Sequence, residues 1–279
     1  MTALRKPAVA GTWYSDSPDV LAADVDGYLA AADPASSLDD LVALVAPHAG
    51  LMYSGPVAAY AYRQLRGRAP KLIALVGPSH FVGFDGVAVY RRGGFASPLG
   101  VVEVDEASAA ALLAASPVCR EHASAHVREH SLEMQLPFVR RLAPDARILP
   151  LVMGWQTDQT ARALGEALAT VLAGRHALLV ASTDLSHYQD ARTAAELDAV
   201  VIDHVSRFDA DGLQRALNAY PEHACGGGPL VAVMRAARAL GARDAVILKY
   251  ADSGDVSGDK SAVVGYLAAA FGTRTGHAR

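Results

Sequence analysis

The sequence predicts an α/β fold with a mostly parallel central sheet that is flanked by helices on both faces. Short runs rich in Val, Ile and Leu alternate along the chain with longer segments of helical character. Several of these runs are apolar on both faces, as buried parallel strands are. Alternation of strands with helices is typical of a parallel sheet that helices cover on both sides.

Six apolar runs are expected to form the strands, because each has the roughly four to eight residues of a typical strand and is rich in aliphatic side chains. In chain order they are residues 41–46, 71–77, 86–90, 147–152, 177–182 and 245–250.

The segments between these runs are expected to form helices. Helix-boundary signals support three of them: Asp105 and Asp158 precede alanine-rich runs, and Gly241 follows the last segment. Pro137 is a candidate kink in the fourth segment. In chain order the expected helices are residues 18–32, 56–66, 106–115, 131–143, 158–173, 191–207 and 229–240.

Composition excludes several classes of protein. With 52% hydrophobic residues and a net charge of -4 over 279 residues, the chain is too apolar for a disordered protein. Its two cysteines form no disulfide framework, and its acidic balance lacks the basic stripe of a nucleic-acid-binding domain. We therefore expect a single α/β domain over residues 1–279 that binds no nucleic acid.

Neither a membrane span nor a secretion signal is expected. The longest apolar stretch, residues 262–271, is far shorter than the ~20 residues that cross a bilayer. Arg5 and Lys6 are followed by polar residues rather than by an apolar signal core. We expect a cytoplasmic protein that has no membrane partner and keeps its thiols reduced.

Histidines recur where predicted strands end, which is where ligands gather in an open α/β sheet. His48 follows the first strand, His80 follows the second, and Asp184 and His187 follow the fifth. Cys225 lies in a Gly-rich loop just before the last predicted helix. Because the surrounding Gly, Pro and Ser residues suit tight loops, we expect these side chains to share one site.

These residue types indicate a metal site, since His and Cys are the usual ligands of iron, copper and zinc. A helix N-terminus lowers the pKa of a thiol, so we expect Cys225 to be a thiolate, the form that binds metal. Two alternatives stay open: single loop histidines are often only solvated, and the glycines after Cys225 could form an anion site without the lysine of a P-loop. Cys119 is expected to be an ordinary reduced thiol.

A second histidine cluster consists of His122, His126 and His130, spaced four residues apart and followed by Glu133. On one continuous helix this spacing would align the three imidazoles. Residues 121–129 lack apolar periodicity, however, so we expect His122 and His126 to be solvated loop residues. His130 and Glu133 lie one turn apart at the start of a predicted helix, where both are candidates to point at the cleft; the alternative is a structural pair that caps the helix or supports the pocket.

Several longer strings, which together cover the chain from residue 5 to about residue 271, resemble the sequence signatures of the Memo family. They are RKPAVAGTWY at 5–14, APHAG at 46–50, GPSH at 77–80, EHSLEMQLPF at 129–138, STDLSH at 182–187 and CGG at 225–227.

This resemblance implies a fold shared with the class III extradiol dioxygenases, which use non-haem Fe(II). It also implies a bacterial protein encoded beside a radical-SAM protein and an AMMECR-like protein, which are candidate partners alongside a small-molecule or peptide ligand. In the family, the metal pocket is lined by the histidines of the PHAG and PSH motifs and by the cysteine of the CGG loop. These residues are His48, His80 and Cys225 here, and Asp184 and His187 match neighbouring pocket positions.

The ligand set that the resemblance implies differs from that of the dioxygenases, whose iron is held by two histidines and a carboxylate. A thiolate is softer than a carboxylate, favours Cu(I) or Zn(II), and alters the redox behaviour of Fe(II). The resemblance implies Fe(II) as the metal, and the thiolate makes copper and zinc the alternatives.

Three functions stay open at this point. The first is a metal-binding protein with redox chemistry, in which Asp184 orients a group or accepts a proton and His187 is an acid/base, with His130 and Glu133 as further pocket residues. The second is an oxygenase that acts on a small aromatic substrate. The third is a non-catalytic module that binds a peptide or a protein partner.

Overall fold

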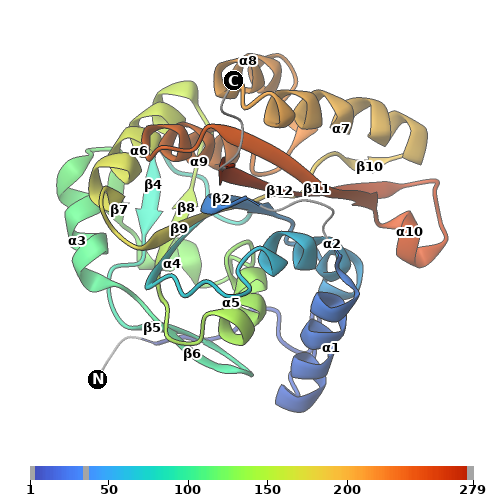
Figure 1. Cartoon of the computed structure of the whole chain (residues 1–279), viewed down its shortest axis with the longest axis horizontal. Coiled ribbons are helices and arrows are strands. Elements are labelled where there is room, and N and C mark those ends of the chain that lie inside the picture. The colour runs from blue at the N-terminus through green and yellow to red at the C-terminus, as the bar shows by residue number, and fades with distance from the viewer. Residues whose placement is uncertain (1–3, 34–37, 275–279) are drawn as a thin grey trace.

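A mixed sheet lies at the centre of the computed structural model, which describes residues 4–33 and 38–274 (Figure 1). Its strands run in the order β10-β12-β2-β9-β3-β8-β4-β7, and β11 also pairs with β12. The strands of this sheet are β2 (Asp40–Ala46), β3 (Leu72–Pro78), β4 (Val87–Val89), β7 (Cys119–Glu121), β8 (Arg147–Met153), β9 (Ala177–Ser182), β10 (His187–Gln189), β11 (Asp244–Asp252) and β12 (Val263–Thr273). A smaller sheet consists of β1 (Leu4–Arg5), β5 (Gly94–Ser97) and β6 (Gly100–Glu103).

The centre of the main sheet is parallel, because β2, β9, β3 and β8 all run in the same direction. Successive side chains of a strand point to opposite faces. Along β2, Leu44 and Ala46 belong to the hydrophobic core on one face, and Ala43 and Val45 belong to the core on the other. The six predicted strands are confirmed to within two residues at each end.

Both flanks of the sheet are antiparallel, so the sheet as a whole is mixed rather than mostly parallel. On one flank β4 is antiparallel to β8, and on the other β12 is antiparallel to β2, β10 and β11. The connection between β11 and β12 spans only residues 253–262. A parallel neighbour needs a crossover of about a dozen residues or more, so this connection favours antiparallel pairing.

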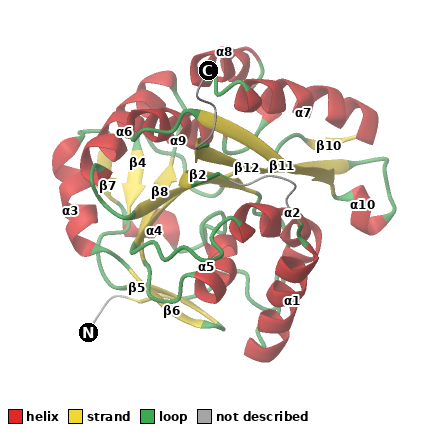
Figure 2. Cartoon of the chain, in the orientation of Figure 1, coloured by secondary structure: helices red, strands yellow, loops and turns green. Residues whose placement is uncertain are grey.

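Helices cover both faces of the sheet, as predicted (Figure 2). Side chains of α1, α2, α4 and α5 pack in the core on one face, and those of α3, α6, α7, α8 and α9 pack in the core on the other. The helices are α1 (Pro18–Ala31), α2 (Leu51–Arg63), α3 (Glu106–Ala115), α4 (Ala123–His126), α5 (Leu136–Leu142), α6 (Asp158–Leu172), α7 (Ala191–Ser206), α8 (Ala210–Ala219), α9 (Gly227–Ala239) and α10 (Gly254–Ser257), with 3-10 turns η1 (Glu133–Gln135) and η2 (Pro221–His223).

Two helices begin more than two residues from the predicted start. Helix α2 begins at Leu51 rather than Pro56, because the Leu51 amide donates to the Trp13 carbonyl oxygen and secures the first turn. The predicted helix 131–143 is divided into η1 and α5, and Pro137 lies at the start of α5 instead of kinking it. Proline fits the first turn of a helix because an amide hydrogen is not needed there.

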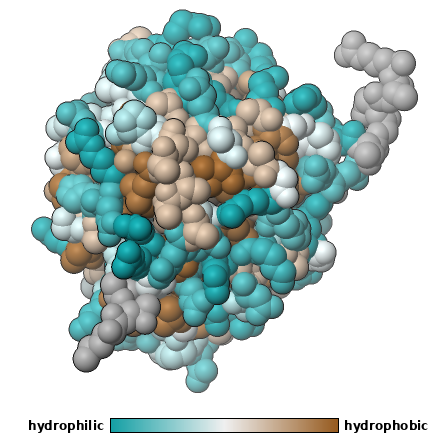
Figure 3. Space-filling view, turned by 90° about the vertical axis from the view of Figure 1, so that its left-hand side faces the viewer, coloured by the Kyte–Doolittle hydropathy of each residue, from teal (hydrophilic) through white to brown (hydrophobic). Residues whose placement is uncertain are grey.

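The side of the molecule that lies at the left of Figure 1 carries α3. Figure 3 faces this side and shows apolar residues gathered across its middle, with hydrophilic residues around them. On α3 the exposed residues include Ala110, Ala111 and Ala114. Small apolar side chains at a surface are common in folded proteins. Within residues 4–33 and 38–274, no helix has both the length and the apolar character needed to cross a bilayer.

The carboxyl ends of the parallel strands lie at one edge of the sheet. His48 follows β2, His80 follows β3, and Asp184 follows β9. In register, Ala46 at the end of β2 pairs with Ser182 at the end of β9. This edge therefore positions the residues that the sequence singles out.

Candidate metal centre

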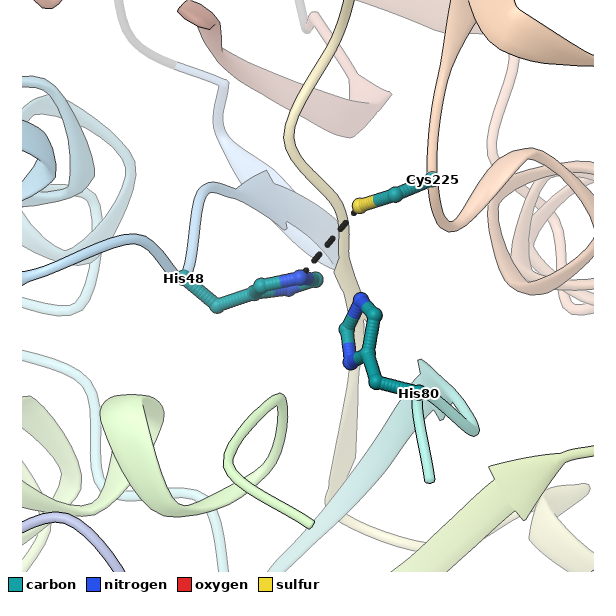
Figure 4. Close-up of side chains that lie close together, drawn as sticks. All are labelled: His48, His80 and Cys225. Carbon is teal, nitrogen blue, oxygen red and sulfur yellow. Dashed lines mark hydrogen bonds between the residues drawn. The ribbon is translucent and has the colours of Figure 1, made fainter. Parts of the chain in front are cut away.

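Three residues of metal-ligand type converge at this edge. His48, His80 and Cys225 each offer one ligand atom, and these atoms lie within 4.8 Å of one another. Figure 4 shows the three side chains pointing toward one another from the loop after β2, the loop after β3 and the loop before α9. His48 is buried, whereas the side chain of His80 is 27% exposed. The cluster is therefore accessible from one side.

The hydrogen bonds around His48 fix which ring nitrogen faces the cluster. The Ser182 hydroxyl donates to the Ser131 carbonyl oxygen (2.7 Å) and accepts from Gln135 Nε2 (2.8 Å). Because its proton is already committed, Ser182 Oγ accepts from Nδ1–H of His48 at 2.9 Å. His48 Nε2 then keeps its lone pair and lies 3.3 Å from Cys225 Sγ. Burial lowers the pKa of His48, which keeps the ring neutral and able to bind a metal.

A buried carboxylate holds His80 in the same way. Glu129 Oε1 lies 2.9 Å from His80 Nδ1, and Glu129 Oε2 accepts from the His80 amide at 2.6 Å. Despite its burial, hydrogen bonds and the nearby His80 ring lower the pKa of Glu129 to about 2. His80 Nε2 makes no hydrogen bond within the described residues. A carboxylate that fixes Nδ1 of a histidine in this way is common around metal ligands.

Cys225 lies in a desolvated position beside Asp184. The Asp184 amide donates to Cys225 Sγ at 3.3 Å, and the Cys225 amide donates to the Asp184 carbonyl oxygen at 3.2 Å. Burial raises the pKa of the Cys225 thiol, and the negative charge of Asp184 adds to this effect. The expectation that the start of α9 lowers this pKa is wrong without a metal, because desolvation outweighs the helix terminus. A cation in contact with the sulfur would instead lower the pKa of the thiol.

The Asp184 side chain binds the loop that carries His48. Its Oδ1 accepts from the His48 amide at 2.7 Å, and burial raises the pKa of the carboxyl group. Together with the backbone contacts to Cys225, this carboxylate joins two of the three ligand loops. Asp184 therefore positions the cluster through the backbone of His48.

His187 borders Cys225 from another side. Its Nδ1 donates to the Leu185 carbonyl oxygen at 2.8 Å, which leaves Nε2 free. His187 and Cys225 line one cavity of about 350 Å³. The pairing of β10 with β12 is irregular between His187 and Gln189, and Tyr188 between them has a φ of 62°. A bulge of this kind re-aims the neighbouring side chain.

His130 packs against the cluster as predicted. Its ring stacks on His80 with centroids 4.5 Å apart and contacts Trp13 at 4.3 Å. Burial lowers the pKa of His130 to about 4, and its Nδ1 has no hydrogen-bond partner in the described part of the chain. His80, Glu129 and His130 also bring ligand-type atoms within 4.8 Å of one another.

The expectation that Glu133 points at the cleft is wrong. Its carboxylate is buried against the N-terminal segment, where it pairs with Arg5 and accepts from the Ala8 and Val9 amides at 2.7 and 3.1 Å. The Tyr14 hydroxyl donates to it at 2.6 Å. Residues 130–132 are not helical and the 3-10 turn begins only at residue 133, so the helical spacing that would place both side chains on one face does not apply. Glu133 instead anchors the segment that presents Trp13 to His130.

The expectation that His126 is solvated is also wrong. His126 ends the short helix α4 and is buried, with its Nε2 3.1 Å from the Ala88 carbonyl oxygen. It packs edge-on against Tyr90 and Phe95. Neither His126 nor His122 belongs to the metal-type groups found among the described residues. Cys119 is buried in β7, in keeping with an ordinary thiol.

The burial of His126 predicts a loss of stability in acid. Its pKa falls from 6.5 to about 3 because burial disfavours the charged ring. Protonation of His126 therefore favours the unfolded chain. Below pH 6.5 this single residue lowers the free energy of unfolding by about 1.4 kcal/mol for each pH unit. Urea unfolding of His126→Gln between pH 6 and pH 4 should show a shallower decline than wild type by about that slope. The exposed-residue control His176→Gln should follow wild type, and equal slopes for His126→Gln would contradict this prediction.

Sequence reasoning missed the residues that fix the two imidazoles. Glu129 holds His80, and Ser182 and Gln135 set the orientation of His48. All three lie inside the family-like strings quoted above, at positions 129–138 and 182–187. Glu129 directly precedes His130, and Ser182 lies two residues before Asp184, so closeness to these candidates is a signal that could have found both.

The comparisons with known proteins agree on a family. A family model described as Memo-like protein matches residues 5–270. The MEMO1 family protein MTH_45 of Methanothermobacter thermautotrophicus is 37% identical over 94% of this chain and 98% of its own length. The MEMO1 family protein MK0963 of Methanopyrus kandleri is 38% identical over 96% of this chain and 98% of its own length.

A solved structure shows the same fold at low sequence identity. The uncharacterized protein JW3007 of Escherichia coli K12 superposes with a TM-score of 0.52 and 15% identity, covering 81% of this chain and 99% of the other. The α/β fold with a helix-flanked central sheet is thus confirmed, and the match is consistent with the expected class III extradiol dioxygenase-like fold.

Proposed function

The chain belongs to the family of Memo-like proteins, and from this premise we propose that it binds one transition-metal ion through His48, His80 and Cys225. One observation carries the proposal: the three ligand atoms lie within 4.8 Å of one another although they come from three separate loops. Both imidazoles are held at Nδ1 by hydrogen bonds, which leaves the lone pair of each Nε2 available to a metal. Preorganised ligands of this kind favour metal binding.

The chemistry of the donor set fits a borderline or soft metal ion. Two imidazoles and one thiolate suit iron, copper or zinc, and the resemblance to the family favours Fe(II) first. The buried sulfur supports the same conclusion, because a cation compensates the cost of a desolvated thiolate. A bound iron or copper ion would supply redox and Lewis-acid chemistry.

The other polar residues have separate roles in this proposal. Asp184 orients the His48 loop through the His48 amide. His187 holds or moves a proton at Nε2, since its Nδ1 is committed to the Leu185 carbonyl oxygen. His130 packs between His80 and Trp13 and so covers one side of the cluster. We place the protein in the reducing cytoplasm, where the Cys225 thiol stays available.

A second candidate function is the oxidation of a small molecule by an oxygenase reaction. It is favoured by the cavity of about 350 Å³ that His187 and Cys225 share, which would hold a small substrate beside one proposed metal ligand, Cys225, and beside an acid/base. Oxygen uptake by iron-loaded protein with a panel of catechols under reducing conditions tests this candidate. Uptake above the metal-free control would support it, and its absence across the panel would retire it.

Elemental analysis of protein purified without chelators tests the metal site itself. We expect about one metal ion per chain in wild type and less than about a tenth of that in His48→Ala and Cys225→Ala, because each removes a ligand. Cys119→Ala is the matched control, since it removes the other thiol, and it should keep its metal. An unchanged metal content in both ligand variants would overturn the assignment.

A further inference from the structure

A buried carboxylate that the proposed function does not use lies beneath the loop of His187. Asp198 has no exposed surface and lies on the inward face of α7, where the other buried residues are Ala and Val. Its Oδ1 accepts from the Ser186 amide at 2.9 Å, and its Oδ2 accepts from the Tyr250 hydroxyl at 2.8 Å. Both partners are uncharged, and keeping a carboxylate buried among neutral groups is costly. A role for this charge is therefore expected.

A glycine of β12 makes room for this carboxylate. A Cβ at Gly265 would lie 1.9 Å from Asp198 Oδ2, so a side chain there would displace the carboxylate. The same glycine binds the His187 loop, since its amide donates to the Ser186 carbonyl oxygen at 3.0 Å and its carbonyl oxygen accepts from the Leu185 amide at 2.8 Å. Helix α7 and strand β12 therefore hold residues 185 and 186 together.

The peptide group between Leu185 and Ser186 connects Asp198 to His187. This peptide is trans, and in a planar trans peptide the N–H and the C=O point in opposite directions. Its N–H, which belongs to Ser186, donates to Asp198. Its C=O, which belongs to Leu185, accepts from His187 Nδ1 at 2.8 Å. One rigid peptide group thus lies between a carboxylate and an imidazole, with a hydrogen bond to each.

This arrangement favours one tautomer of the His187 ring. A carbonyl oxygen can only accept, so Nδ1 carries the proton and Nε2 keeps its lone pair. The negative charge of Asp198 polarises the peptide group and makes the Leu185 carbonyl oxygen a stronger acceptor, because hydrogen bonds in a chain strengthen one another. Leu185, Ser186 and Asp198 are all buried, so water screens this effect little.

Burial raises the pKa of the Asp198 carboxyl group, while its hydrogen bonds and the nearby His187 ring oppose the rise. The ring and the carboxylate therefore stabilise each other across the peptide group. A carboxylate commonly orients a histidine by direct contact, as Glu129 does with His80. In the loop of His187 the same chemistry acts through one intervening peptide group.

We propose that Asp198 is a positioning residue for His187, which it holds in the Nδ1–H form through the Leu185–Ser186 peptide group. His187 Nε2 is thereby kept as a proton acceptor in the residue that shares a cavity with Cys225. This inference deepens the proposed function and rests on the acid/base role given there to His187. The tautomer is nevertheless a property of the metal-free chain, so it can be measured whether or not a metal binds.

NMR of metal-free protein labelled with 15N-histidine measures the tautomer, because protonated and unprotonated ring nitrogens differ widely in 15N shift. The signals of His187 are those that disappear in His187→Gln. At about pH 8.5, where an unperturbed imidazole is neutral, wild type should show a protonated Nδ1 and an unprotonated Nε2. In Asp198→Asn, which keeps the shape and loses the charge, the ratio of the Nδ1–H to the Nε2–H form should fall at least about threefold.

The matched control is Asp203→Asn, which removes an exposed carboxylate of the same helix that pairs with Arg207 and should leave the ratio unchanged. If Asp198→Asn does not fold, Asp198→Ala replaces it as a smaller side chain that removes both the charge and the acceptor, and the ratio should fall about fivefold or more. A wild-type ring that is protonated at Nε2, or an unchanged ratio in the folded Asp198 variant, would overturn the proposal. Loss of the metal assignment in the elemental analysis would leave this result unaffected.

Discussion

Glu133→Gln should lower the free energy of unfolding by about 3–5 kcal/mol, the usual cost of removing one partner of a buried ion pair. Glu133 and Arg5 are both buried, and their contact joins the N-terminal segment to the η1 turn. The variant leaves the Arg5 guanidinium without its counter-charge, although backbone carbonyl groups of His126 and Glu129 still accept from it. Chemical denaturation at pH 7 measures the change.

Glu103→Gln is the matched control for this prediction. Glu103 also pairs with an arginine, Arg147, at 3.5 Å, but its side chain is 69% exposed. Exposed pairs contribute less than about 1 kcal/mol, so this variant should unfold almost as wild type does. The double variant Arg5→Met, Glu133→Leu should cost less than the sum of the two single changes, because it leaves no buried charge. A cost below about 1 kcal/mol for Glu133→Gln would contradict the anchoring role.

Glu129→Gln should weaken metal binding by about 10–100-fold, the range expected when the group behind a metal-binding histidine is removed. The Glu129 carboxylate accepts from His80 at both the amide and Nδ1, with a pKa held at about 2. A neutral amide keeps the shape of the side chain and loses the charge that orients and polarises the imidazole. Competition with a chelator of known affinity measures the Kd of the metal.

Glu121→Gln controls for the loss of a carboxylate from the same stretch of chain. Glu121 is exposed and pairs with Arg91 at 3.3 Å, outside the cluster, and the variant should bind metal as wild type does. Thermal denaturation of Glu129→Gln in the metal-free state separates a misfolded protein from a weakened site. A folded Glu129→Gln protein with wild-type metal affinity would show that Glu129 does not support His80.

The strands that can be predicted from the sequence are those whose own side chains form a clear apolar run. β2 and β9 are runs of Leu, Val and Ala buried on both faces, and they were predicted within one residue. β12 was not predicted, although it is the longest strand of the sheet among the described residues. Its Ala268, Ala269, Ala270 and Gly272 have low strand propensity. It becomes a strand because β2 and β11 pair with it, which is information that lies elsewhere in the chain.

Position after a strand was the informative signal for the site. It led to His48 and His80, while position before a helix led to Cys225, and the ligand atoms of all three lie together. Spacing along a presumed helix gave a wrong prediction. The one-turn separation from His130 pointed to Glu133, rather than Glu129, as the carboxylate near the cluster. The segment there turns through a 3-10 helix, and only its path in space shows that Glu129 contacts His80 while Glu133 contacts Arg5.

The most direct test of the metal centre is a crystal structure of protein loaded with one metal, with diffraction data collected at the absorption edge of that metal. We expect one anomalous peak bonded to His48 Nε2, His80 Nε2 and Cys225 Sγ, at about 2.0–2.1 Å from the nitrogens and about 2.3 Å from the sulfur if the metal is zinc. A peak on other residues, or an empty cluster in crystals that hold the metal elsewhere, would contradict it.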